Sequence, residues 1–401
     1  MKKQDLIPII VIFALFLAYP TIDRKVIAKF FPPKAKPAPA AVEQAEAPAL
    51  PADTALAAPE AKAEPAPADE AAAAEPASPE AEPAAAEENQ APEEFATLAN
   101  ERLELTLSSH GAGIVRAAIL GYPSVRGSDV PVTFDFSDRL AAAPVGYPGL
   151  APRAAFDVVA SANDSIAYRK ALPGGLVLER TLTLGANYQL QIVDRVHNTS
   201  SAAIPLSGYG LQAGFMGNLP GEDEKQQVPL LGVDSLTGSD SVQYWGGKFD
   251  KWFPVDGAAQ PQALPGPDED PIHVDWVAVK NKYFTQILTP AEGADRCLVE
   301  AEHGKPVQST FMLLFPRTTI PIARVAAALQ LPDFDLAPGQ TLEQSSTFYI
   351  GPKVYTELKA NGPHQEDILQ LGFWRVVGIW ILKVMVWIQA HVWPYSYGLA
   401  I

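Results

Sequence analysis

A histidine and two carboxylates are the residues of this chain with the best types and spacing for chemistry. His197 lies in the stretch VDRVHNTSSAAIPL, with Asp194 three residues earlier and Glu179 in the preceding apolar stretch. A histidine acid and a carboxylate base can together move protons on and off a sugar ring. Because a lone histidine at the end of a strand is usually structural, we expect this set to be non-catalytic.

Other common catalytic and metal-binding patterns are missing from the sequence. It has no G-x-S-x-G, H-E-x-x-H or P-loop motif, and the glycines of HGAGI at 110–114 join two expected strands without opening a helix. Cys297 is the only cysteine, so we expect a buried free thiol and no intrachain disulfide. We therefore expect no cofactor, no metal and no enzyme. The remaining histidines stand at no metal-ligand spacing: His110, His273, His303, His364 and His391.

The elements that would position such residues are β-strands between residues 95 and 351. Apolar residues alternate with period two in RLELTLS (102–108), GLVLERTLTL (175–184) and IHVDWVAV (272–279), and Arg180 falls on the leucine face of the second stretch. No helix-length segment separates the strands, which predicts a mainly β fold, a large sandwich of two antiparallel sheets over 95–360. Further strands are expected at 112–120, 154–160, 165–171, 188–197, 204–212, 282–289, 296–302, 307–315, 322–331 and 341–350.

A short helix is expected after the last strand. The stretch PKVYTELKA at 352–360 has Pro352 in the position of a first helical turn, and Asn361-Gly362 provides a stop.

An acidic linker is predicted between residues 32 and 94. From residue 41 to 94 the sequence is nearly all Ala, Pro and Glu, with 14 acidic residues against one lysine, which accounts for most of the formal charge of −16. Such a segment cannot bury enough apolar surface to offset its ordering entropy, so we expect an extended, solvated tether. No Lys/Arg stripe with interleaved aromatic residues is present, which argues against nucleic-acid binding.

The N terminus, residues 1–31, reads as a transmembrane anchor. Residues 6–22, LIPIIVIFALFLAYPTI, are apolar and just long enough to cross a hydrocarbon core of about 30 Å. A small-x-small cleavage site is not evident after them, so we expect an uncleaved anchor rather than a signal peptide. More cations follow the span than precede it, which favours the following segment on the cytoplasmic side.

The sequence of the C-terminal residues 361–401 predicts an amphipathic helix on a membrane surface. Residues 368–393 contain no proline, and on a helical wheel the polar residues gather in one seam of a broadly apolar helix. Two cations near the middle make a deep span costly, whereas tryptophan prefers the headgroup level. A core helix of the preceding domain is the alternative. The residues expected at the membrane interface are Trp374, Arg375, Trp380, Lys383, Trp387 and Trp393.

The order of these segments resembles the first half of the YidC family of membrane protein insertases, over essentially the whole chain. The likeness is carried by KKQDLIPIIVIFALFLAY (2–19), NERLELTLSSHGAGIVRAAILGYP (100–123), VDWVAVKNKYFTQILTP (274–290), STFYIGPKVYTELK (346–359) and LGFWRVVGIWILKVMVWIQAHVWPYSYGLAI (371–401).

The resemblance implies a protein of the Gram-negative inner membrane that contacts the lipid bilayer, nascent membrane proteins and the Sec translocon. It implies a cytoplasmic N terminus, opposite to the orientation that cation counting favours, and places residues 32–394 in the periplasm as a β super-sandwich and an interfacial helix. The family's five-helix core, with its hydrophilic groove and functional arginine, would begin where this sequence stops, so the chain is expected to be a fragment that lacks the groove. The alternative is a tethered carbohydrate-binding or aldose-epimerase-like sandwich that uses His197.

Overall fold

The described part of the chain covers most of the β region and little of either end. The computed structural model describes residues 91–370, except 126, 220–229, 239–241, 256–259, 267–268 and 312–314, together with residues 378, 380 and 381. All of these residues belong to one compact unit, Glu80–Ile401. The predicted anchor at 6–22 and the acidic linker up to residue 90 lie outside the described residues.

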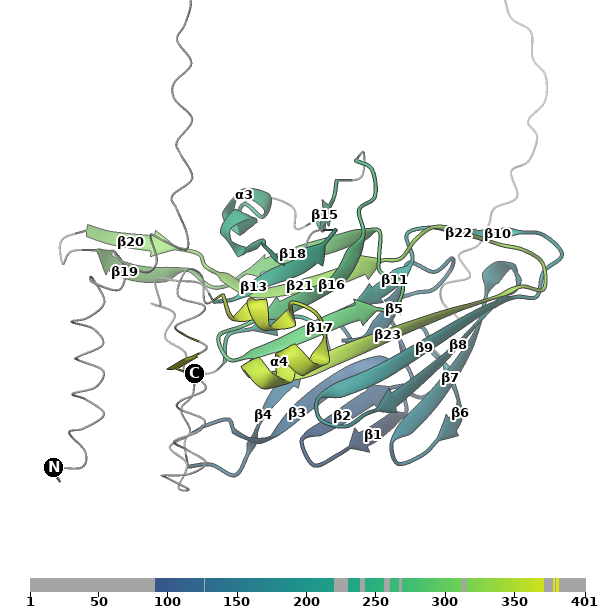
Figure 1. The fold of residues 1–401 in the computed structure, drawn as a ribbon, viewed down its shortest axis with the longest axis horizontal. Helices are drawn as coiled ribbons and strands as arrows, with labels where there is room; N and C mark the ends of the chain where they lie inside the picture. The colour runs from purple at the N-terminus through teal and green to yellow at the C-terminus, as the bar shows by residue number, and fades with distance from the viewer. Residues whose placement is uncertain are drawn as a thin grey trace, which may run out of the picture. The chain divides into compact units, whose positions relative to one another are not determined.

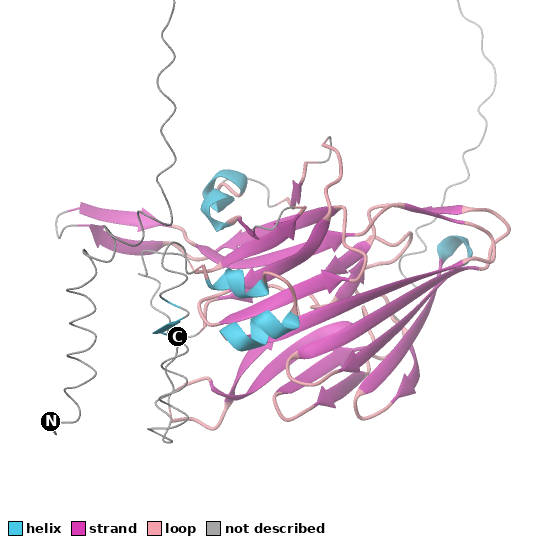
Figure 2. Ribbon diagram, in the orientation of Figure 1, coloured by secondary structure: helices cyan, strands magenta, loops and turns pink. Residues whose placement is uncertain are grey.

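The fold is mainly β, as predicted, and every pair of strands among the described residues is antiparallel (Figures 1 and 2). The largest sheet has the order β14 (Val242–Tyr244), β13 (Gly232–Thr237), β16 (Val274–Lys280), β17 (Phe284–Pro290), β23 (Thr341–Pro352), β9 (Gln189–Asn198), β8 (Leu176–Leu184), β7 (Ser165–Leu172) and β6 (Asp157–Ser161).

Two further sheets complete the sandwich. One has the order β1 (Phe95–Ala99), β2 (Leu103–Ser108), β3 (Gly113–Pro123) and β4 (Pro131–Asp135). The other has the order β15 (Gln262–Leu264), β18 (Arg296–His303), β21 (Ile322–Gln330), β11 (Gly210–Gln212) and β5 (Ala143–Val145), with β12 (Met216–Gly217) also on β21. Small ladders join β10 (Ile204–Leu206) to β22 (Phe334–Leu336) and β19 (Val307–Phe311) to β20 (Phe315–Thr319).

Alternating apolar residues explain why these segments become strands with one face in the core. Leu103, Leu105 and Leu107 of β2 are fully buried, as are Leu178 and Leu182 of β8. Successive side chains of a strand point to opposite faces, so each such stretch covers one side of its sheet with leucine. This burial removes apolar surface from water at roughly 25 cal/mol per Å² and is the main source of the domain's stability.

Strand β16 departs from simple alternation because both of its faces are covered. Trp276 and Ala278 are buried on one face, and Val277 and Val279 are buried on the other. Ile272, predicted to belong to this strand, precedes it and is 41% exposed. A strand in the middle of a sandwich that also carries a covering segment has little solvent face, so its central residues, WVAV at 276–279, are continuously apolar.

Three predicted elements differ in detail from the structure. Pro352 ends β23 instead of starting a helix, because its peptide group still continues the sheet, and α4 (Tyr355–Asn361) begins after it. The expected strand at 204–212 is two strands, interrupted at Gly208, whose φ of +69° turns the chain. The expected strand at 307–315 is the first part of the β19–β20 hairpin.

Few helices accompany the sheets in the described chain. They are η3 (Pro173–Gly175), η4 (Gly246–Lys248), α3 (Phe249–Trp252), α4 and η5 (Gln365–Leu369), and the described residues 378, 380 and 381 are helical as well. Both α4 and η5 lie against the large sheet near β17 and β23, where Figure 1 draws them in yellow. Within the described residues, no helix has the length and hydropathy needed to cross a bilayer.

Candidate functional site

The junction at 362–370, where the chain leaves the β domain towards the predicted interfacial helix, is the candidate site. Of the predicted interface residues only Trp380 is described, and it is helical and 68% exposed. Its neighbour Ile381 is helical and exposed as well. Trp374, Arg375, Lys383, Trp387 and Trp393 lie outside the described residues, so their role at a membrane stays a prediction.

Hydrogen bonds to the large sheet hold the first part of the junction. The indole nitrogen of Trp276 donates to the carbonyl of Pro363 at 2.9 Å, and the side-chain amide of Gln365 donates to Thr289 Oγ1 at 3.2 Å. Trp276 and Gln365 are both fully buried. A buried Trp N–H or amide needs a partner, so these bonds fix the path of the segment as well as its depth.

A buried ion pair holds the second part of the junction. The ammonium of Lys280 at the end of β16 donates to Asp234 Oδ2 on the adjacent β13, and also to the carbonyl of Ile368 at 3.3 Å. The same ammonium lies 5.3 Å from the ring centre of Tyr244, whose hydroxyl donates to the carbonyl of Asp367 at 3.0 Å. The backbone carbonyls of Asp367 and Ile368 in the junction are therefore bound directly to the large sheet.

Burial dominates the electrostatics of this pair. Removal from water raises the pKa of Asp234 to about 6, although the positive charge of Lys280 opposes that rise. Burial also lowers the pKa of Lys280, with Asp234 opposing the change. Each group thus keeps its charge largely because the other is beside it. The arrangement can anchor a segment of the chain on the sheet.

The structure separates one carboxylate of the sequence-predicted set, Asp194, from His197. His197 lies on the outer face of β9, with its Nδ1 2.9 Å from Thr341 Oγ1, whereas Asp194 is buried on the opposite face. Glu179 lies on the same outer face as His197, two residues beyond Val177, the cross-strand partner of His197, but it is exposed and pairs with Arg169 at 3.5 Å. The His197–Asp194 combination of the epimerase-like alternative is therefore wrong, since residues three apart on a strand point to opposite sides.

Asp194 instead pairs with Arg180 inside the core. The two residues are direct cross-strand neighbours on β8 and β9, and Arg180 Nε lies 3.2 Å from Asp194 Oδ1. Burial raises the pKa of Asp194, and the guanidinium of Arg180 opposes it. Among the described residues the guanidinium nitrogens have no hydrogen-bond partner. The described part of the chain also contains no cluster of His, Cys, Asp or Glu able to hold a metal ion.

Comparison with known protein families identifies the relationship of this chain. A model of the YidC periplasmic domain matches residues 96–388, which is most of the sequence and nearly all of the described part. The chain belongs to the YidC periplasmic domain family. The match runs from β1 through the junction into the predicted interfacial helix.

Relatives of this chain are named membrane protein insertase YidC. The chain is 27% identical over 304 residues to the membrane protein insertase YidC of Bordetella avium, covering 72% of this chain and 49% of the relative. It is 24% identical over 318 residues to the YidC of Xanthomonas axonopodis pv. citri, covering 74% of this chain and 49% of the relative. The chain thus spans about half the length of the relatives it matches.

Solved structures with a similar arrangement come from another group of proteins. A galactose mutarotase related enzyme from Lactobacillus acidophilus matches with a TM-score of 0.42 and 13% identity, over 64% of this chain and 97% of that one. A putative aldose 1-epimerase from Escherichia coli K12 matches with a TM-score of 0.41 and 12% identity, over 65% of this chain and 100% of that one.

Sequence reasoning missed the ion pair at the junction of this YidC domain. Asp234 and Lys280 are 46 residues apart, and nothing local in the sequence marks either one as buried. The Arg180–Asp194 pair had a usable signal, because Arg180 alternates with buried leucines and the two residues are equally spaced about the turn between β8 and β9. A charge on a leucine face calls for a partner on the adjoining strand.

Proposed function

We propose that this chain provides the membrane-tethered periplasmic part of a YidC-type membrane protein insertase in a bacterial inner membrane. The family match over residues 96–388 carries the proposal, because it includes both the β domain and most of the predicted interfacial helix. Relatives named as membrane protein insertases support the same assignment.

The proposed layout follows the segments recognised in the sequence. Residues 1–31 anchor the chain with the N terminus in the cytoplasm, residues 32–94 form the acidic tether, and residues 95–360 form the β domain. Residues 361–401 contain the interfacial helix and the start of a second transmembrane segment, so that residues 32–394 lie in the periplasm. The exposed indole of Trp380 supports this layout, because tryptophan settles at the headgroup level of a bilayer.

The junction gives this layout a physical basis. Helix binding at a membrane surface is strengthened when the helix starts from a fixed point, since less orientational freedom is lost on binding. The bonds from Lys280, Tyr244 and Trp276 to backbone carbonyls hold that starting point on the large sheet. The β domain then acts as a scaffold that sets where the helix meets the lipid.

The proposed partners are the lipid bilayer, nascent membrane proteins and components of the Sec translocon. Polar groups cost several kcal/mol each when they cross hydrocarbon unpaired, and an insertase lowers that cost by providing a protected route. The scaffold requires neither a cofactor nor a nucleotide for its part in the process. No specific observation favours the carbohydrate-related alternative.

A chimera tests the proposal. The corresponding half of the Bordetella avium insertase is replaced by this chain, and the chimera is expressed in cells depleted of their own insertase. We expect growth and insertion of a reporter membrane protein to be restored. A chimera that reaches the membrane intact but supports neither growth nor insertion would contradict the proposal.

Fluorescence quenching tests the interfacial helix separately. The full chain is placed in nanodiscs whose lipids carry bromine on the acyl chains, which quench only tryptophans close to the hydrocarbon. We expect Trp380→Phe to remove part of the quenched signal, whereas the matched change Trp252→Phe, on α3 of the β domain, leaves the quenched signal unchanged. Equal quenching in the wild type and both variants would count against an interfacial position for Trp380.

A further inference from the structure

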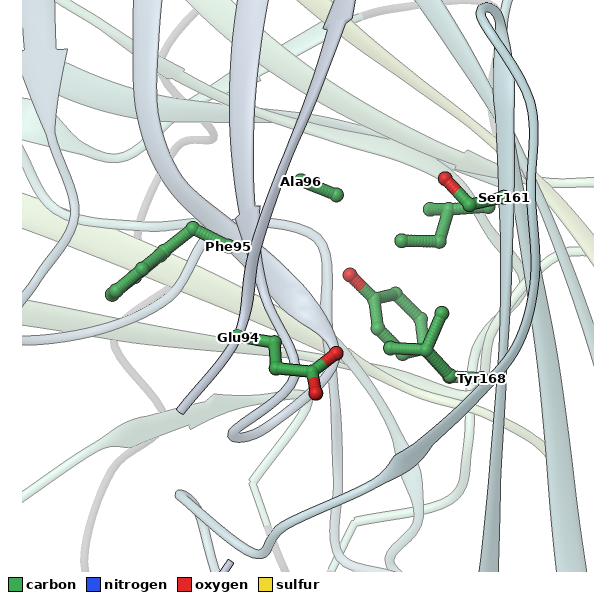
Figure 3. Close-up of a pocket in the computed structure, with 7 residues that line it drawn as sticks. Glu94, Phe95, Ala96, Ser161 and Tyr168 are labelled. Atoms are coloured by element: carbon green, nitrogen blue, oxygen red, sulfur yellow. The ribbon is translucent and has the colours of Figure 1, made fainter. Parts of the chain in front are cut away.

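Two strands at the edges of their sheets, β1 and β6, line a common groove. In the described chain β6 ends the large sheet and β1 ends the sheet β1-β2-β3-β4. A pocket of about 160 Å³ lies between them, lined by residues of both edges and of β7 (Figure 3). A second pocket of about 280 Å³ shares Glu94 and Val158 with the first, so the two pockets are adjacent and are together called the groove.

The edge of β6 is only partly protected against further pairing. All five of its residues, DVVAS, are exposed, and Val159 at the bulge opposite β7 is 56% exposed. Natural sheet edges are usually short or bulged, or carry lysine, proline or an inward charge, and these features hinder another strand from joining. Of these features β6 has a length of five residues, the bulge and Asp157 at its first position, but it has no lysine and no proline. Across the groove, Phe95 of β1 is 59% exposed.

The floor of the groove contains a buried polar group without a partner. Tyr168 of β7 is 1% exposed, and its hydroxyl makes no hydrogen bond within the described chain. Figure 3 shows the ring between the two edges, with the hydroxyl oxygen directed into the pocket. Buried hydroxyls in folded proteins nearly always have a partner, so this one is suited to a polar atom of a ligand.

The charges along the groove restrict what can occupy it. Among the described residues that line the two pockets, the charged ones are Glu94 and Asp157, and both are acidic. The chain's own linker enters the groove region at Ala91, but it carries Glu87 and Glu88 just before that point. Repulsion between like charges therefore disfavours the linker as the occupant and favours a segment that is neutral or basic.

We propose that this groove binds an extended apolar segment of another polypeptide, flanked by basic residues, which joins the free edge of β6 as an added strand. Main-chain hydrogen bonds to β6 supply the affinity, and alternate side chains of the segment contact Val158, Phe95 and the Tyr168 hydroxyl. The proposal goes beyond the insertase assignment and does not depend on it, because binding is tested with peptide alone.

The test is a titration of the full chain in detergent micelles with a fluorescein-labelled peptide, Lys-Val-Thr-Val-Thr-Val-Lys, followed by fluorescence anisotropy. We expect saturable binding that weakens at least about tenfold with Val159→Lys, because the new charge blocks the strand edge. The matched change Val125→Lys places the same charge on an exposed valine of the turn after β3, and we expect unchanged affinity. Tyr168→Phe is expected to weaken binding by about threefold or more through loss of the hydroxyl.

Changes to the peptide and the linker complete the test. A peptide with every backbone amide N-methylated has no N–H donor on either edge and cannot pair with a strand edge, so its failure to bind supports the proposal even if a protein variant folds poorly. Saturable binding of that peptide, or equal affinity in the Val159→Lys variant, would overturn it. Deleting residues 41–85 is expected to leave the affinity unchanged, and a gain of more than about tenfold would instead assign the groove to the chain's own linker.

Discussion

Two buried ion pairs lie in the same large sheet, but their surroundings differ. Arg180 and Asp194 pair between β8 and β9 in the core, where the guanidinium nitrogens find no hydrogen-bond partner among the described residues. Lys280 and Asp234 pair between β16 and β13, where the ammonium also binds the carbonyl of Ile368. The first pair satisfies a charge within the core, and the second connects the sheet to the junction.

The difference also concerns how each cation can respond to the loss of its partner. An arginine keeps its charge at any pH that a protein tolerates, whereas a buried lysine can become neutral by losing a proton. The pKa of Lys280 is already lowered by burial even with Asp234 beside it. Loss of the carboxylate is therefore expected to lower the free energy of unfolding less for the Lys280–Asp234 pair than for the Arg180–Asp194 pair.

The largest effect is expected for Asp194→Asn. This change leaves the guanidinium of Arg180 charged, buried and unpaired, which costs about 3–5 kcal/mol of the free energy of unfolding. Urea denaturation of the chain in detergent micelles measures the loss. The double variant Arg180→Met with Asp194→Leu serves as the control, because it removes both charges and should restore most of the stability. If Asp194→Asn were as stable as the wild type, the buried guanidinium of Arg180 would not need Asp194 as its partner.

A smaller and pH-dependent loss is expected for Asp234→Asn. The cost at neutral pH is about 2–3 kcal/mol, because Lys280 escapes part of the penalty by losing its proton. A lowered folded-state pKa means that the unfolded chain binds more protons, so stability rises with pH. We expect the loss to shrink in urea titrations as the pH rises above neutrality towards 10.5, the ordinary pKa of a lysine, while the loss in Asp194→Asn stays constant. The same slope in both variants would remove the contrast between the two cations.

Anchoring can be separated from stability with the double variant Asp234→Leu and Lys280→Met. Replacing a buried ion pair by apolar residues is often close to neutral, so we expect the free energy of unfolding to change by less than about 1.5 kcal/mol. The carbonyl of Ile368 loses its donor, however, and amide exchange of Asp367 and Gln370 should become several-fold faster. Unchanged exchange at these two amides would show that the junction is held by its other bonds.

The smallest effect is expected for Arg195→Ala. Arg195 and Glu343 form an ion pair of 2.7 Å between β9 and β23, but both side chains are about half exposed. Water screens such pairs, so the free energy of unfolding should change by no more than about 1 kcal/mol. A loss as large as that of Asp194→Asn would show that burial does not govern these ion pairs.

The fold could be predicted from the sequence further than the site could. The leucines of β2 and β8 alternate with a period that only a strand satisfies, and both segments form strands with those leucines buried. The prediction failed at the connections between strands. A turn at Gly208, or one between β19 and β20, depends on a few residues that the alternation of apolar residues does not mark.

The junction depends on strand order, which a single sequence does not reveal. Asp234 meets Lys280 only because β13 and β16 are neighbours, although the segment between them includes β14 and α3. The groove has the same origin, since the stretch at 154–160 was expected to be a strand but not to end a sheet. Both features arise from contacts between segments that are distant along the chain.

The single cysteine, Cys297, allows opening of this domain to be measured by thiol labelling. Cys297 is fully buried on β18, which lies between β15 and β21 in its sheet. Burial raises the pKa of its thiol to about 12. Thiol reagents attack the thiolate, so the closed molecule is almost inert towards them. The rate of labelling at this one position therefore counts how often these strands separate, and a cysteine introduced anywhere on the surface can be tagged selectively against a silent background.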